Sequence, residues 1–91
     1  MNIEALPGGA LIREGLDDLN TGRESAAALL VAVGAPRLRR VGLQVPPARF
    51  DHAEHRLYEI LARSHGNSAH SRYNALIRLL VSFERACECA G

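Results

Sequence analysis

The chain has 91 residues, a net charge of +1, 47% hydrophobic residues and 23% charged residues. This length and composition predict one globular domain over residues 1–91 and exclude a disordered chain. Two cysteines near the end exclude a disulfide framework.

The sequence carries no sign of export or membrane insertion. No stretch approaches the roughly 20 apolar residues of a membrane span. The first residues, Met1 to Glu4, lack the basic and apolar regions of a secretory signal. We therefore expect a cytoplasmic protein. All eleven basic residues are Arg, and with the abundant Ala, Gly and Leu this composition is bacterial-looking.

Two helices are predicted in the first third of the chain. The first covers about residues 10–19, and Asn20 is suited to end it. Thr21 and Glu24 have the spacing of a capping box, which predicts a second helix over about residues 22–33. Residues 26–33 carry no charge, and a helix that is apolar all round is normally buried. We expect Gly34 to end this helix. The apolar stripe of the first helix consists of Leu11, Ile12, Leu16 and Leu19.

A short helix and an extended segment are predicted next. Pro36 suits the first position of a helix over about residues 36–41, which Gly42 would end. Residues 43–47 are predicted to be extended, because Pro46 and Pro47 forbid an ordinary helix there.

Two more helices complete the predicted fold. One covers about residues 51–64, with Asp51 as its cap, and residues 65–68 form a turn. The other is centred on residues 73–87 and has so wide an apolar surface that we expect it to be packed on several sides. The sequence therefore predicts an all-α protein, a compact bundle of four main helices plus one short helix, with the C-terminal helix central. The stripe of that last helix consists of Tyr73, Leu76, Ile77, Leu80, Phe83 and Cys87.

One segment raises the possibility of nucleic-acid binding. About residues 24–43 resemble in outline a DNA-binding helix-turn-helix, with the turn at Gly34. Arg37, Arg39 and Arg40 would lie on the recognition helix, and Arg49 would extend the positive patch, which could neutralise phosphates. Against this interpretation, a helix of about two turns presents few side chains to a major groove.

Histidines and cysteines offer weaker sites. His52 and His55 could share a helix face, but Cys87 and Cys89 would point roughly 200° apart around their own helix, so we predict no metal and no cofactor. A third alternative is a small helical nuclease or hydrolase. Its acid and phosphate clamp would come from His65, His70 and Arg72, although no spacing there matches a catalytic motif.

The sequence favours a small protein–protein interaction or regulatory module over these alternatives. Two strongly apolar helices in 91 residues leave few other elements to cover them. Any apolar surface left uncovered marks an interface, and symmetric dimers are the commonest solution for small chains. We therefore expect a non-catalytic module with a protein partner, and a homodimer as its form.

Overall fold

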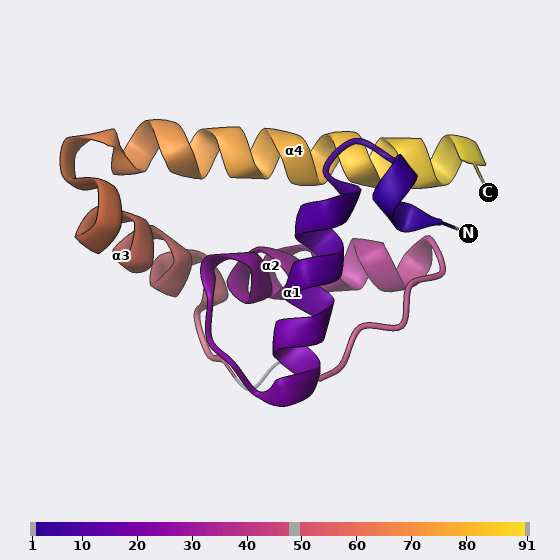
Figure 1. The fold of residues 1–91 in the computed structure, drawn as a ribbon, viewed down its shortest axis with the longest axis horizontal. Coiled ribbons are helices and arrows are strands. Elements are labelled where there is room, and N and C mark those ends of the chain that lie inside the picture. The colour runs from indigo at the N-terminus through magenta and orange to yellow at the C-terminus, as the bar shows by residue number, and fades with distance from the viewer. Residues whose placement is uncertain (1, 48–49, 91) are drawn as a thin grey trace.

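The computed structural model describes residues 2–47 and 50–90, and all of its regular structure is helical (Figure 1). The all-α prediction is confirmed, and these residues contain no strand. The α-helices are α1 (Gly9–Thr21), α2 (Ala26–Arg40), α3 (Ala53–His65) and α4 (Ala69–Ala90), and the 3-10 helices are η1 (Ile3–Ala5) and η2 (Gly66–Ser68).

The expected set of four main helices and one short helix is not matched, because α2 continues through the predicted turn. Gly34 is buried inside α2 and has no positive φ, so it does not act as a left-handed stop. Pro36 also lies inside the helix, where it removes the amide that would bond the Ala32 carbonyl. Both Ala32 and Pro36 border a surface hollow. Burial of the flanking residues holds the two halves together as one helix.

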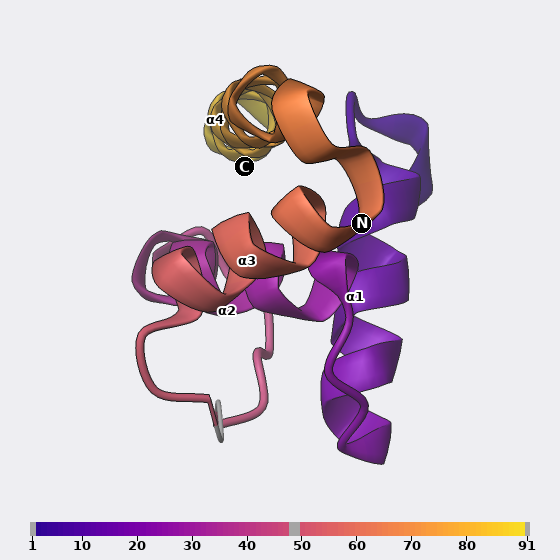
Figure 2. The same cartoon turned by 90° about the vertical axis from the view of Figure 1, so that its left-hand side faces the viewer.

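The central helix is α2, and the prediction that the C-terminal helix is central was wrong. Helix α2 packs against α1, α3 and α4, whereas α4 runs along one edge of the molecule (Figure 1). Figure 2 shows α4 nearly end-on, with α3 leading from the level of α2 up to it. The wide apolar surface of α4 is divided between a buried face and half-buried flanks, since Leu79 and Val81 remain partly exposed. The buried residues of α2 are Ala27, Ala28, Leu29, Leu30, Val31, Gly34, Ala35 and Leu38.

The start of α2 is fixed by Ser25 and not by the predicted capping box. The Ser25 Oγ accepts a hydrogen bond from the Ala28 amide at 3.1 Å and donates one to Asp18 Oδ2 at 2.6 Å. Thr21 instead ends α1, and the Glu24 carboxylate is bonded by Arg56 of α3. Ser25 thus caps α2 and also ties it to the end of α1.

The last two helices lie close to their predicted positions. Helix α3 begins two residues later than predicted, and the predicted turn at 65–68 contains η2. Helix α4 begins directly after η2 and extends to Ala90, so it is longer than the predicted apolar stripe. Among the described helices, none combines the length and the apolarity that crossing a membrane requires.

The crossing of α1 over α2 depends on the absence of a side chain at Gly15. A Cβ at this position would lie 2.4 Å from the Ala27 carbonyl oxygen and 2.5 Å from Val31 Cγ2. A backbone oxygen in the middle of a buried helix cannot move aside as a flexible side chain can. The two helices therefore approach as closely as they do only with glycine at this position.

Replacing Gly15 by Ala separates two opposing effects. Helix propensity alone predicts that Gly15→Ala stabilises α1 by about 1 kcal/mol. The clash predicts the reverse, a loss of about 1–3 kcal/mol in the free energy of unfolding measured with urea. Asp17→Ala, at an exposed position of the same helix, is the control and should change stability little. A Gly15→Ala protein more stable than the wild type would contradict the close crossing.

Candidate functional site

A groove of about 290 Å³ lies between α2 and α4. A Cβ on Gly34 would lie 2.8 Å from Leu80 Cδ1, so the two helices approach closely at this point and Leu80 is buried beneath them. Both walls are largely aliphatic, and an acidic and a basic residue border them. The lining residues are Val33, Gly34, Pro36 and Arg37 from α2, and Ile77, Leu80, Val81 and Glu84 from α4.

Glu84 is the unusual residue of this groove, because its exposed fraction is only 4%. Among the residues that the structure describes, it is the one buried polar or charged side chain. Its Oε1 lies 3.8 Å from Nη1 of Arg37, which is an ion pair but too long for a hydrogen bond. Within the described part of the chain, no donor lies within hydrogen-bonding distance of this carboxylate.

The surroundings of Glu84 disfavour its charged form. Burial raises the pKa of Glu84, and the nearby Glu88 adds to this, while Arg37 acts in the opposite direction. Arg37 has a side-chain exposure of 69%, so water weakens its attraction. The residue is buried, but its carboxylate oxygens are not sealed from solvent, since no side-chain oxygen or nitrogen of the described residues is both buried and without a hydrogen-bond partner. Glu84 is therefore a carboxylate held in a largely apolar wall, where burial disfavours its charge and the groove leaves its oxygens accessible.

Glu84 is not among the site residues predicted from the sequence, although the sequence contains a signal for it. Glu84 follows Leu80 by four residues and precedes Cys87 by three, which places it on the buried face of the helix. A charged residue at an apolar position of a helical stripe is the pattern that predicts such a site.

Replacing Glu84 by Gln should reveal the cost of its charge. A raised pKa means that the folded chain binds this proton more tightly than the unfolded chain. Glu84 therefore favours folding below its ordinary pKa of 4.5, and this contribution is lost as pH rises through the folded-state value. We expect Glu84→Gln to match the wild type in acid and to be more stable than it at neutral pH.

Urea unfolding of both proteins, at a pH below 4.5 and at neutral pH, measures this difference. The comparison with Gln cancels the other carboxyl groups, including Glu24, whose pKa is lowered and whose contribution has the opposite pH dependence. A Glu84→Gln protein that is less stable than the wild type at neutral pH would show instead that the pair with Arg37 is stabilising.

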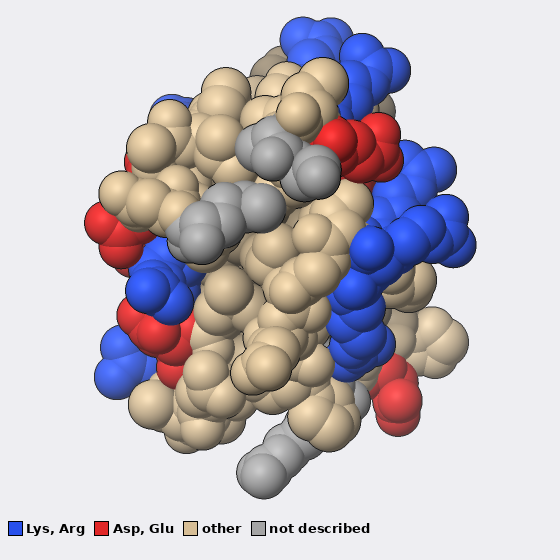
Figure 3. All heavy atoms as spheres, turned by 90° about the vertical axis from the view of Figure 1, so that its right-hand side faces the viewer, with Lys and Arg blue, Asp and Glu red and all other residues tan. Residues whose placement is uncertain are grey.

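The predicted arginine patch is dispersed among different roles. Arg37 faces Glu84, and Arg39 donates hydrogen bonds to the Val45 carbonyl from Nε at 3.3 Å and from Nη2 at 3.1 Å. Arg40 is exposed beside a hollow that Glu88 also lines. Arg49 lies outside the described residues. Figure 3 shows basic side chains along one edge of the end where α2 and α4 finish.

The helix-turn-helix interpretation of about residues 24–43 was wrong at the level of structure. Residues 26–40 form one helix, so there is no turn at Gly34 and no separate recognition helix. Arg37, Arg39 and Arg40 all lie in the last turn of α2. Nucleic-acid binding by these residues stays a prediction, without the motif that first pointed to it.

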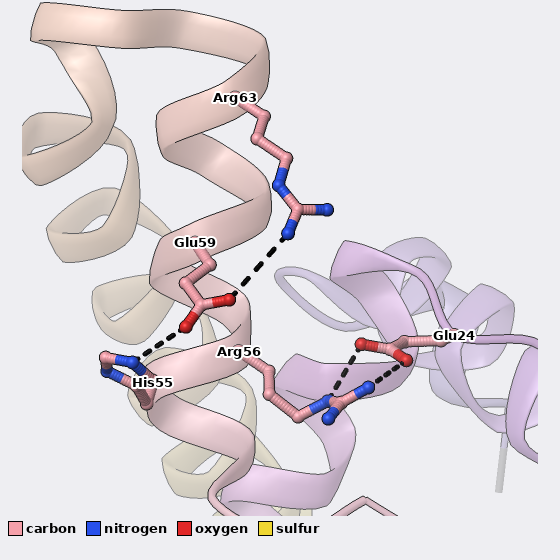
Figure 4. Close-up of polar contacts among 5 residues, drawn as sticks. All are labelled: Glu24, His55, Arg56, Glu59 and Arg63. Carbon is pink, nitrogen blue, oxygen red and sulfur yellow. Dashed lines mark hydrogen bonds and ion pairs between the residues drawn. The ribbon is translucent and has the colours of Figure 1, made fainter.

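A second charged cluster joins α3 to the start of α2 (Figure 4). Arg56 donates from Nε to Glu24 Oε2 at 2.9 Å and from Nη2 to Glu24 Oε1, while Glu59 pairs with His55 and Arg63. The hydrogen bond from Arg56 lowers the pKa of Glu24, and the same bond raises the pKa of Arg56. All of these residues except His55 border a hollow of about 480 Å³. Because its acidic and basic groups neutralise one another, we interpret this cluster as a clamp between elements.

The other predicted groups are not assembled into a site. No group of three or more metal-binding side chains comes together among the described residues, so His52 and His55 do not meet the cysteines. Cys87 is buried, and burial raises the pKa of its thiol, while Cys89 is exposed. The residues of the nuclease alternative, His65, His70 and Arg72, are all exposed, and the His70 ring lies 6.4 Å from that of Tyr58.

Comparison with known proteins gives this fold no relative. No protein-family model matches the chain, and neither a curated protein nor a solved structure is significantly similar to it. A function must therefore be inferred from the chain's own residues. The α2–α4 groove with its buried carboxylate is the feature that packing alone does not account for.

Proposed function

We propose that the chain is a protein–protein interaction module that self-associates, with the α2–α4 groove inside the interface. The observation that carries this proposal is the α2–α4 groove, whose walls are largely aliphatic and in which Glu84 is buried. Val33, Ile77 and Val81 border it and are only half-buried. Covering such a surface with another apolar surface releases water and favours association.

A second copy of the chain is the partner that these residues fit. A two-fold interface uses the same surface on both subunits, so an aliphatic channel flanked by half-buried aliphatic residues can pack against its own copy. A chain this short also buries a modest fraction of its surface alone and gains stability by association. Two of the arginines that would instead favour nucleic acid make intramolecular contacts, since Arg37 pairs with Glu84 and Arg39 donates hydrogen bonds to the Val45 carbonyl.

Sedimentation velocity across a micromolar-to-millimolar concentration series tests self-association. We expect the wild type to sediment as a dimer at the upper end and to dissociate on dilution. Val81→Arg places a positive charge in the groove and should shift the dimer to monomer throughout the series. Ser82→Arg, the same change at the next, exposed residue of α4, should leave the dimer intact.

A second variant guards against a folding defect in Val81→Arg. Pro36 is an exposed residue of the groove inside α2, so Pro36→Arg removes a helix breaker while adding a positive charge to the proposed interface. This protein should fold at least as stably as the wild type, but it should remain a monomer at concentrations at which the wild type is a dimer. A wild type that stays monomeric at the highest concentration, or a Pro36→Arg protein that dimerises normally, overturns the proposal.

A further inference from the structure

We propose that the α2–α4 groove is a recognition site for a cationic aliphatic side chain, whose charged head pairs with Glu84. The stem of that side chain would lie against Val33, Ile77 and Val81. This inference rests on the proposed function, because the side chain belongs to the surface that enters the groove. When that surface is a second copy, the head is a guanidinium, since all eleven basic residues are Arg.

The chemistry of the groove matches both parts of such a side chain. A carboxylate offers two oxygens that together accept several hydrogen bonds, and Glu84 receives none from the described residues. A guanidinium can fill them with two parallel bonds, which are stronger than bonds between neutral groups. Arg and Lys also bury their methylene stems along apolar surface while the head keeps a polar partner. The aliphatic walls and the carboxylate supply these two environments side by side.

The chain's own Arg37 leaves this position open. Its guanidinium stays 3.8 Å from Glu84, and its side chain is 69% exposed, so it lies at the rim of the groove. An incoming cation could occupy the space between the walls without displacing a hydrogen bond. The second copy has arginines to offer, because several exposed ones form no ion pair with the described residues. They are Arg40, Arg72, Arg78 and Arg85.

Two small probes of the same shape test whether the groove binds a cationic ligand in preference to a neutral one. n-Butylguanidinium carries the head and stem of an arginine, and N-butylurea is its neutral counterpart. Each is titrated into the dilute, isotopically labelled full chain while amide chemical shifts are followed by NMR. We expect n-butylguanidinium to shift Val33, Ile77, Val81 and Glu84, and to bind at least about tenfold more tightly than N-butylurea.

The Glu84→Gln variant identifies the carboxylate responsible. It keeps the size of the side chain and should lose the tenfold preference. Glu88→Gln removes the next acid along α4, which is exposed, and should retain the preference. Equal binding of both probes, no binding of either, or a preference that survives Glu84→Gln overturns the inference.

The two proposals can fail separately. A chain that stays monomeric yet binds n-butylguanidinium through Glu84 refutes self-association and leaves the cation site. A chain that dimerises through Val81 and Pro36 but shows no preference between the probes keeps the interface and loses the cation site.

Discussion

The structure depends on burying α2 on several sides at once. Its uncharged first half cannot face water, so α1, α3 and α4 all pack against it. Two glycines permit this close packing, since Gly15 lets α1 approach the α2 backbone and Gly34 lets Leu80 of α4 approach α2. Polar contacts then hold the elements in register. Ser25 joins α2 to α1, and the pair of Glu24 and Arg56 joins the α2 start to α3.

The groove exists because α2 continues past Gly34 and Pro36. Had the helix ended at Gly34, the turn that carries Arg37 would not lie beside α4, and Glu84 would have no charged neighbour from α2. Helix-breaking residues inside a helix and a carboxylate on a buried helix face both depart from the local sequence pattern expected of a buried helix. They occur at the same place, where α2 and α4 line the groove. Such coincident conflicts are more often found at functional sites than in ordinary packing.

The sequence predicted the existence and type of most helices, because period-3.6 apolar stripes mark them directly. The predictions were wrong where tertiary contacts determine how a helix begins, ends or packs. Thr21 and Glu24 match a capping box by spacing, but the Glu24 carboxylate is engaged by Arg56, more than thirty residues away. Gly34 and Pro36 predict the end of one helix and the start of another, yet burial of the surrounding residues keeps α2 intact. The width of the apolar surface on α4 likewise could not show that its flanks stay half-exposed.

The candidate site was only partly accessible from the sequence. Interaction through uncovered apolar surface was expected, but the surface could not be located before α2 and α4 were placed side by side. The arginine patch was predicted from composition, which cannot show that Arg39 would bond the Val45 carbonyl or that Arg37 would face Glu84. Glu84 itself could have been found, since it interrupts the buried face of α4.

The location of the interface can be measured directly with an NMR dilution series of the wild-type chain. If two copies meet at the α2–α4 groove, the amide signals of Val33, Ile77 and Val81 should move as the protein is diluted. Those of Ser71 and Ser82, on the exposed face of α4, should stay fixed. Signals that are independent of concentration, or that move on the exposed face of α4 instead, would contradict the account.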